Sequence, residues 1–148
     1  MDTEKFRHTI ELRVRNFEVD WQNIVHNAIY LQYFEIGRIE YLKHIGIDVT
    51  AEQINSASKV VIVRNEINYF LSARFDELLR VYTRIKYIKN SSFAFEGYIE
   101  ETSSKRKIAD NISVHVWLDQ STRKSKRVND EFRDKVSSFE RNSVEFLT

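Results

Sequence analysis

Residues 8–45 read HTIELRVRNFEVDWQNIVHNAIYLQYFEIGRIEYLKHI and contain the change of hydrophobic period that decides the fold. Up to residue 17, apolar and polar residues alternate, and one face carries Ile10, Leu12 and Val14. A period of two predicts a half-buried strand. After a polar loop, the apolar residues take helical spacing from about Asn27 to Ile45. The segment therefore predicts a strand that is followed directly by a long helix.

The predicted helix is apolar over most of its circumference, which is typical of a helix that is buried on most sides. Gly37 in its middle costs about 1 kcal/mol of helix propensity relative to alanine. We expect the compensation to be the close approach of a neighbouring backbone. Gly46 stands where a glycine commonly terminates a helix.

The rest of the chain predicts four more strands and one more helix. Apolar residues alternate, or Val and Ile predominate, in the segments 59–70, 79–88, 92–101 and 107–118. The connections after the second and third of these are short and polar, as hairpins require. Residues 129–140 carry Phe132, Val136 and Phe139 at helical spacing.

This order of elements predicts the fold class. Successive hairpins make an antiparallel sheet, so the chain is expected to be α+β. We predict a five-stranded antiparallel sheet wrapped around a long central helix, with a C-terminal helix, in one domain over residues 1–148. A chain of this length buries a sizeable core.

The composition of the chain excludes several classes of function. The net charge of +1, from 23 basic and 22 acidic residues, gives no basic excess that would favour nucleic acid as a partner. The chain has no cysteine, which excludes disulfides, zinc thiolates and a cysteine nucleophile. The acidic, polar start and the lack of a long apolar run predict no signal peptide and no membrane partner, and hence a cytoplasmic protein. His8, His44 and His115 lack ligand spacing, so we expect no metal site.

Two blocks of sequence resemble a known family. Residues 14–35, VRNFEVDWQNIVHNAIYLQYFE, are similar to the signature of the 4-hydroxybenzoyl-CoA thioesterase and YbgC-like acyl-CoA thioesterase family. Residues 69–78, YFLSARFDEL, resemble its Tyr-x-x-Pro-Ala-Arg-x-Asp stretch. Three positions depart from the pattern. Asn23 replaces the usual glycine, Ser72 the usual proline, and Asn27 a residue that is often His or Tyr. Asparagine is the best substitute for glycine if position 23 needs a positive φ.

The resemblance implies a hotdog fold and hydrolysis of an acyl thioester. It makes Asp20 the catalytic carboxylate, either as nucleophile or as general base on water. The backbone N–H of Asn27 at the helix start is the expected oxyanion hole, with that of Ala28 or His26 as second choice. The Asn27 side chain and the His26 ring are further catalytic candidates.

Each of these residues also has a purely structural interpretation. Acidic residues before helices usually serve as turn or capping residues, which is the alternative for Asp20. Asn27 is equally suited to be a helix N-cap. His26 as a loop histidine and Tyr30 as a packing residue of the helix are the corresponding alternatives.

The resemblance also implies contacts with the substrate. We expect them from Ile24, Val25, Tyr30, Asn68, Tyr69, Lys89 and Ser92. No cofactor is expected, because coenzyme A enters as part of the substrate. Its phosphates need a basic partner. Lys89 in a predicted turn and the basic run 123–127 are the candidates, although charge runs are usually solvated loops.

Family members pair their sheets edge to edge and form active sites at the interface. The chain is therefore expected to be a homo-oligomer, either a dimer or a dimer of dimers (a homotetramer), with the region of Asn68 and Tyr69 as the wall of the partner's site. Three functions stay open: an acyl-CoA thioesterase, an acyl-carrier-protein thioesterase, and a non-catalytic hotdog that binds acyl thioesters.

Overall fold

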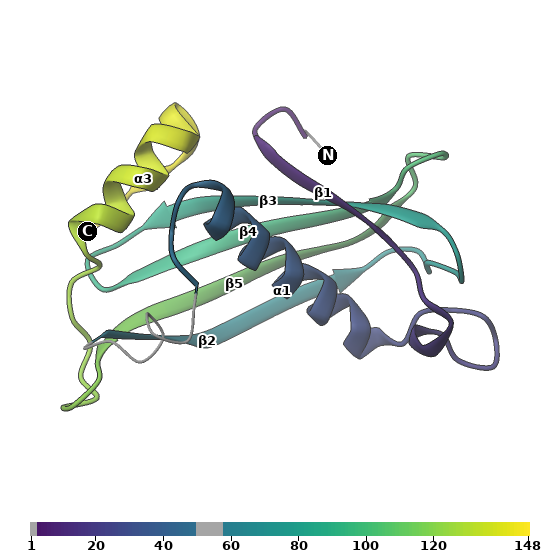
Figure 1. Cartoon of the computed structure of the whole chain (residues 1–148), viewed down its shortest axis with the longest axis horizontal. Helices are drawn as coiled ribbons and strands as arrows, with labels where there is room; N and C mark the ends of the chain where they lie inside the picture. The colour runs from purple at the N-terminus through teal and green to yellow at the C-terminus, as the bar shows by residue number, and fades with distance from the viewer. Residues whose placement is uncertain (1–2, 50–57) are drawn as a thin grey trace.

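Antiparallel strands form one sheet in the computed structural model, which describes residues 3–49 and 58–148. The strands are β1 (His8–Arg13), β2 (Ser58–Tyr69), β3 (Leu78–Ile88), β4 (Ser92–Glu101) and β5 (Lys107–Asp119). Their order across the sheet is β1-β3-β4-β5-β2. The helix α1 (Asn27–His44) crosses one face of this sheet (Figure 1).

The helix α1 is buried along one side, so the prediction that it is buried on most sides is wrong for a single chain. Its buried residues are Tyr30, Tyr33, Phe34, Gly37, Arg38 and Tyr41. At Gly37, an added Cβ would lie 2.7 Å from the Thr83 Oγ1 and 3.0 Å from a Val81 methyl carbon. The expected close approach is therefore real, but the prediction of a neighbouring backbone was wrong. Side chains of β3 occupy the space that a larger residue would need.

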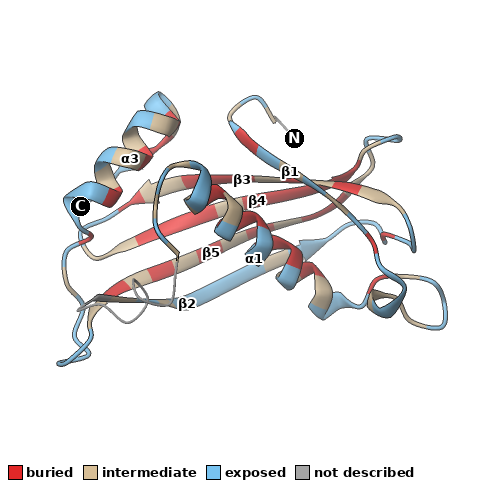
Figure 2. Ribbon diagram, viewed as in Figure 1, coloured by how far each residue is buried: buried red, intermediate tan, exposed pale blue. Residues whose placement is uncertain are grey.

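Two groups of buried side chains form the core between α1 and the sheet. One lies around the first half of α1 and includes Tyr30, Tyr33, Leu79 and Ile108. The other lies around Tyr41 and includes residues of β4, β5 and the C-terminal helix. Figure 2 shows buried residues along β3, β4 and β5, while β2 is largely exposed. The centre of the sheet thus supplies most of the core.

Strand β2 forms one edge of the sheet. It pairs with β5 over its whole length, with a register shift between Ile62 and Arg64. Among the described residues, no strand pairs with its other side. Apolar side chains on this strand are nevertheless exposed, with Val60 at 41%, Ile62 at 46% and Val63 at 59%. An unpaired edge of this length is a site where another strand can add.

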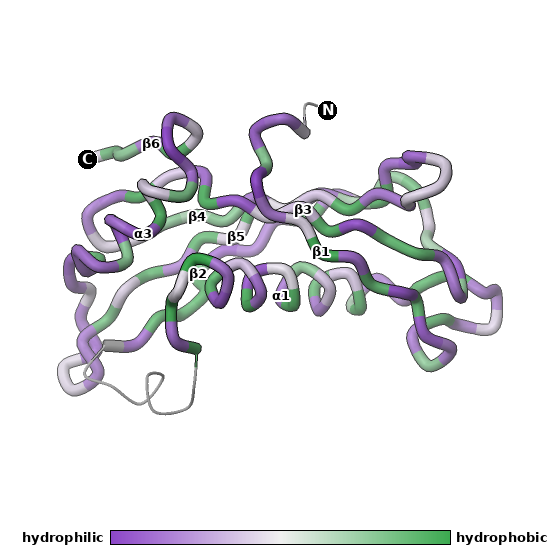
Figure 3. The backbone as a smooth tube through the Cα atoms, turned by 45° about the horizontal axis from the view of Figure 1, so that its top comes forward, coloured by the Kyte–Doolittle hydropathy of each residue, from purple (hydrophilic) through white to green (hydrophobic). Residues whose placement is uncertain are grey.

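The C-terminal segment covers the opposite edge beyond the end of β1. It consists of α3 (Asp130–Glu140), the 3-10 turn η2 (Arg141–Ser143) and β6 (Glu145–Phe146), which pairs in parallel with the end of β3. Between β1 and β6, the Ile85 backbone N–H donates to Glu140 Oε2 at 3.0 Å. Figure 3 shows α3 and β6 at the end of the sheet where the C-terminus lies.

The α+β hotdog prediction is confirmed, with small differences. The first strand ends at Arg13 because Asn16–Glu18 form the 3-10 turn η1. The two-residue β6 was not predicted. The Gly46 prediction is confirmed, since its φ is +87°. The polar sequence of residues 48–58 predicts an irregular segment, and most of it lies outside the described residues. None of the described helices is long and apolar enough to cross a membrane.

Candidate active site

A tight turn holds Asp20 at the entrance to α1. The Asp20 backbone N–H donates to the Ile24 carbonyl at 2.9 Å, and its carbonyl accepts from the Asn23 N–H at 2.9 Å. Asn23 has a φ of 65°, so the left-handed conformation that the sequence indicated is confirmed. The Asn23 Oδ1 also accepts from the Phe75 N–H at 3.2 Å, which ties the turn to the loop before β3.

The Asp20 carboxylate is partly used by this turn. Its Oδ1 accepts from the Gln22 N–H at 2.8 Å and, more weakly, from the Ile24 N–H at 3.4 Å. Within the described part of the chain, Oδ2 has no hydrogen-bond donor. The turn interpretation is therefore correct as far as Oδ1 is concerned. It leaves the second oxygen available to a substrate or to water.

The start of α1 offers unpaired backbone donors. His26 is the N-cap and Asn27 the first helical residue, and the cap makes no side-chain hydrogen bond, so the N-cap interpretation of Asn27 is wrong. The His26 N–H donates to the Glu18 carbonyl at 3.1 Å and is not free. The N–H groups of Asn27 and Ala28 have no acceptor in the described residues. Both residues are exposed, and the bridge between Val19 and Val25 joins the Asp20 turn to the start of α1, where the helix dipole is positive.

Two tyrosines join α1 to the loop that follows β2. The Tyr69 hydroxyl donates to the Asn27 carbonyl at 3.4 Å, and its ring lies 5.8 Å from that of Tyr30. The buried Tyr30 hydroxyl accepts from the Ala73 N–H at 3.0 Å. Burial raises the pKa of the Tyr30 phenol, so it stays protonated near neutral pH. Tyr30 is thus a packing residue in the single chain, while Tyr69 is 45% exposed.

Glu18 is a positioning residue that the sequence analysis missed. Its Oε1 accepts from the Arg15 N–H at 2.7 Å and from the buried Tyr33 hydroxyl at 2.9 Å. Burial and the adjoining Glu18 carboxylate raise the pKa of Tyr33 well above its usual range. Glu18 therefore anchors η1 to α1 directly before Asp20. The signal available was a tyrosine on the buried face of the helix, whose hydroxyl needs a partner.

The structure brings most predicted site residues together. Ile24 is half-buried, and Val25 is in the core, where its N–H donates to the Ala73 carbonyl at 3.0 Å. Asn68 points to the other face of the sheet from Tyr69, since side chains alternate along a strand, and it donates to Asp110 at 2.9 Å. Asn68 is therefore not part of this cluster within the chain.

Lys89 and Ser92 lie far from Asp20 within one chain. They flank the turn between β3 and β4, where the Lys89 N–H donates to the Ser92 carbonyl at 2.7 Å. The Asp20 turn adjoins the other end of β3, which is a strand of 11 residues. At about 3.3 Å per residue, the two ends are roughly 30 Å apart. A single chain does not bring these residues to Asp20.

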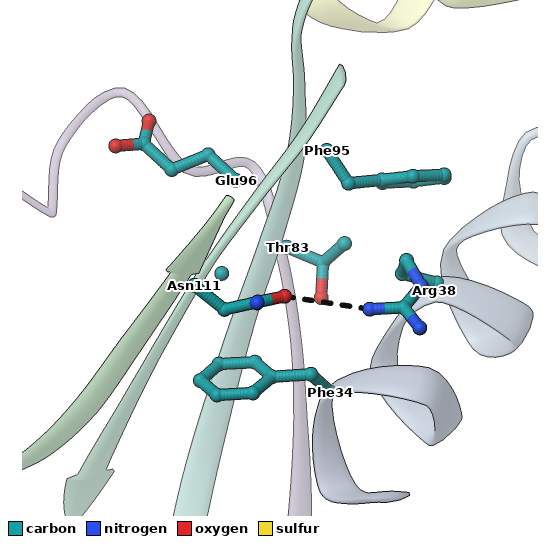
Figure 4. A pocket seen from close by; sticks show the side chains of 7 residues that line it. Phe34, Arg38, Thr83, Phe95, Glu96 and Asn111 are labelled. Carbon is teal, nitrogen blue, oxygen red and sulfur yellow. Dashed lines mark hydrogen bonds between the residues drawn. The ribbon is translucent and has the colours of Figure 1, made fainter. Parts of the chain in front are cut away.

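A narrow hollow lies under the middle of α1. It is lined by Phe34, Arg38, Thr83, Phe95, Glu96, Gly97 and Asn111 (Figure 4). The buried Arg38 guanidinium donates to Asn111 Oδ1 at 3.4 Å. An added Cβ at Gly97 would lie 2.6 Å from the Phe34 ring, so the space is narrow. Burial, and secondarily Arg38, lower the pKa of nearby His115 to about 4, which keeps its ring neutral at pH 7.

A metal centre has no support from the residues that the structure describes. Among residues 3–49 and 58–148, no group of three or more His, Asp or Glu side chains is arranged to hold a metal ion. The groups left available at this end of the sheet are the Asp20 Oδ2 and the backbone N–H groups of Asn27 and Ala28. This combination suits nucleophilic or general-base attack on a carbonyl whose oxygen gains negative charge.

Comparison with known proteins identifies the class. The family model of the thioesterase-like superfamily matches residues 14–136. The chain therefore belongs to this superfamily. The recognition of a YbgC-like hotdog thioesterase is confirmed, and the predicted enzyme class, a thioester hydrolase, is the class of its named relatives.

Particular relatives differ in the carrier of the acyl group. The chain is 33% identical over 116 residues to the chloroplastic acyl-acyl carrier protein thioesterase ATL2 of Arabidopsis thaliana, which covers 78% of this chain and 61% of the relative. It is 25% identical over 126 residues to the long-chain acyl-CoA thioesterase FadM of Escherichia coli, which covers 85% of this chain and 94% of FadM. The chain thus spans about three fifths of the plant relative.

Solved structures agree with the fold. A thioesterase from Thermus thermophilus in complex with coenzyme A and Zn has a TM-score of 0.80 at 24% identity, covering 93% of this chain and 96% of that one. A 1,4-dihydroxy-2-naphthoyl-CoA thioesterase from Synechocystis has a TM-score of 0.81 at 19% identity, covering 86% of this chain and 93% of that one. At these identities the likeness establishes the fold.

Proposed function

We propose that this protein is an acyl-CoA thioesterase, which hydrolyses a thioester to a free acid and coenzyme A. The observation that carries the proposal is Asp20, whose Oδ2 is free, in the turn that leads into the unpaired N–H groups of Asn27 and Ala28. Membership of the thioesterase-like superfamily supports it. We further propose that the single domain covers residues 1–148, works in the cytoplasm and needs no cofactor, with coenzyme A arriving as part of the substrate.

In the proposed reaction, Asp20 acts on the carbon of the thioester carbonyl and the backbone N–H groups act on its oxygen. Asp20 attacks the carbonyl carbon itself, or removes a proton from a water that attacks it. The carbonyl oxygen gains negative charge and accepts hydrogen bonds from Asn27 and Ala28. Collapse of this intermediate breaks the carbon–sulfur bond, and the thiolate leaves and takes a proton. In the nucleophilic route, water then hydrolyses the mixed anhydride on Asp20.

We also propose that two copies pair through β2. The strand has one free edge with exposed apolar residues, and Ile36 and Ile39 on the neighbouring α1 are 46% and 40% exposed. A two-fold axis pairs identical edge strands antiparallel, so the Tyr69 end of one β2 would lie beside the Ser58 end of the other. Lys89 and Ser92 would then act as substrate contacts from the partner subunit, while Asn68 stays with Tyr69 at the Asp20 end of its own chain. Two such dimers form the proposed tetramer.

A second candidate is hydrolysis of acyl groups on a carrier protein. Similarity to the plant acyl-acyl carrier protein thioesterase favours it. The chemistry at Asp20 would be the same, because the thioester is the same. A hotdog that binds acyl thioesters without turnover is the third candidate.

The test is steady-state hydrolysis of a panel of aliphatic and aromatic acyl-CoA thioesters with a thiol-trapping reagent. Asp20→Asn is the matched variant, since its side-chain oxygen still accepts from Gln22. We expect kcat to fall about 10²–10⁴-fold, as loss of acid–base catalysis does, with an unchanged Tm. Full turnover in Asp20→Asn would refute the assignment of Asp20. Activity on carrier-bound acyl groups alone would change the proposed substrate to an acyl carrier protein. Binding of acyl-CoA without turnover would refute the proposed catalytic activity.

A further inference from the structure

An arginine is buried under α1 without an anionic partner. Arg38 is 7% exposed and forms no ion pair among residues 3–49 and 58–148. Its guanidinium carries five N–H donors, and its hydrogen bond to Asn111, at 3.4 Å, is a long one. Glu96 lines the same hollow, but its carboxylate is bound by Arg84 at 2.6 Å and by Lys5 at 3.3 Å. A buried charge without a partner is unfavourable, so this cation is suited to receive an anion.

The unpaired nitrogens of Arg38 are not sealed inside the protein. Within the described part of the chain, the side-chain polar atoms that are both buried and unpaired belong to His8, Trp117 and Glu140. Burial lowers the pKa of Arg38, and the exposed Glu35 one turn earlier opposes this shift without lying at ion-pair distance. The guanidinium still stays charged at neutral pH, because arginine is not deprotonated in proteins.

One face of β2 leads from the candidate active site to this cation. The Tyr69 hydroxyl contacts the start of α1, and the Asn65 Oδ1 accepts from the Asn111 amide at 2.6 Å. Both side chains therefore lie on the face of the sheet that carries α1, with the partly buried Ile67 between them. Tyr69 and Asn65 are exposed. This face thus begins with apolar side chains and then reaches the amides that adjoin Arg38.

The distance between the two ends fits the length of a fatty-acyl chain. From Asn27 to Arg38, α1 advances about 16 Å. From Tyr69 back to Asn65, β2 advances about 13 Å. A fully extended chain advances about 1.2 Å per bond, so the span takes roughly 11–13 bonds. A chain that begins at the thioester carbonyl would bring its far end to Arg38.

We infer that Arg38 selects acyl chains whose far end carries a carboxylate. The substrate is then a coenzyme A thioester of a dicarboxylic acid, and the products are the free diacid and coenzyme A. This inference rests on the proposed acyl-CoA thioesterase function. A planar guanidinium pairs with a carboxylate through two parallel N–H donors, and the apolar side chains before it suit the methylene groups. A chain of the same length with a methyl end would leave the buried charge unpaired.

Binding can be measured without catalysis in Asp20→Asn. In this protein, the monothioester of dodecanedioic acid with coenzyme A should bind about 10–100-fold more tightly than dodecanoyl-CoA, because only the former carries a carboxylate for Arg38. Isothermal titration calorimetry gives both Kd values. Adding Arg38→Met, which keeps a long unbranched side chain, should remove the difference. Arg64→Met is the matched control, since Arg64 is exposed on the other face of β2 and pairs with Glu66 at 3.2 Å.

Kinetics with the same pair of substrates test the selection itself. In the wild type, the ratio of kcat/KM for the carboxylated chain to that for the plain chain should be largest near 12 carbons, in a panel of about 8–16 carbons. Arg38→Met should lower this ratio about 10–100-fold. Arg38→Lys should keep part of it, because the charge remains and the planar fork is lost. If Arg38→Met fails to fold, Asn65→Asp serves instead, since a carboxylate at this exposed position competes for Arg38.

The other outcomes overturn either the inference or the proposed function. A ratio near one at every chain length would overturn the inference, as would a fall in the ratio that is equally large in Arg64→Met. An equal preference for a terminal hydroxyl would assign the far end to the amides of Asn65 and Asn111 and not to the cation. Tight, Arg38-dependent binding of the carboxylated thioester by a protein that hydrolyses no thioester would support the Arg38 site while refuting the proposed enzyme.

Discussion

The two ends of α1 are built in opposite ways. At the C-terminal end, the Gly46 N–H donates to the Lys43 carbonyl at 3.1 Å and the Ile47 N–H to the Leu42 carbonyl at 2.9 Å, which is a Schellman motif. Lys135 of α3 donates to the Gly46 carbonyl at 2.6 Å. At the N-terminal end, the cap makes no side-chain bond and two N–H groups stay free. One end is saturated for stability, and the other keeps donors available for chemistry.

The prediction with the largest expected effect removes a single backbone N–H donor at the N-terminal end of α1. Asn27→Pro deletes the N–H at the first helical position, where proline is well tolerated. The preceding His26 has φ −60° and ψ 140°, which suits a residue before proline. We expect kcat to fall about 10²–10³-fold, as for the loss of one oxyanion donor. The measurement is steady-state hydrolysis of an acyl-CoA.

Asn27→Ala is the control for that experiment, because it keeps the N–H and removes only the side chain. If Asn27→Ala loses as much activity as Asn27→Pro, the side chain and not the backbone stabilises the oxyanion. Thermal melts of both variants should match the wild type.

The next largest effect is a loss of stability at the C-terminal end of α1, where Tyr41 contacts Glu140. The fully buried Glu140 accepts from the Tyr41 hydroxyl and from the Ile85 N–H, so Glu140→Ala leaves two buried donors without an acceptor. We expect a loss of about 3 kcal/mol. For a chain of this size that lowers Tm by roughly 6–12 °C. Chemical denaturation measures it, with the exposed Glu131→Ala of the same helix as control. An equal, small change in both variants would contradict a special role for Glu140.

A smaller loss is expected from the glycine of the Schellman motif. Gly46→Ala places a Cβ at φ +87°, which costs on the order of 1 kcal/mol of stability while kcat stays unchanged. Gly46→Asn should lose less, because asparagine tolerates this conformation better. Equal melting temperatures for all three proteins would show that the conformation of this residue costs nothing.

The prediction with the smallest expected effect adds a side-chain cap at the N-terminal end of α1. His26→Ser supplies a hydroxyl that can accept from the N–H groups of the first turn, which stabilises a helix by about 0.5–1 kcal/mol. The rise in Tm should be accompanied by a lower kcat, because the new cap competes with the substrate for the same donors. A more stable protein with full activity would mean that the Ala28 N–H takes no part in catalysis.

Hydrophobic period predicted the main elements closely. The helix predicted over 27–45 is found at Asn27–His44, and that predicted over 129–140 begins after the Asn129 cap. Asn23 and Gly46 were readable because only a few residue types adopt positive φ. Element bounds depend on local pattern, which the sequence contains.

Contacts between segments that are distant in the sequence were harder to predict. The role of Glu140 depends on a gap between β1 and β6 that appears only when three elements meet at one edge. At Gly37, the sequence shows that space is needed but not whether a backbone or a side chain fills it. Lys89 looked favourable as a basic turn, yet the direction of β3 carries it away from Asp20. The free N–H groups at Asn27 and Ala28 followed from helix geometry, while the role of Glu18 became visible only in the folded turn.

The contact between Glu140 and Ile85 has a consequence for the motions of the molecule. The Ile85 amide lies on an edge where neither β1 nor β6 pairs with it, and its N–H donates to a side chain of α3. Its hydrogen can exchange with solvent only when the C-terminal helix lifts from the sheet. Local opening of the sheet edge and undocking of α3 are therefore one event, governed by a single opening rate.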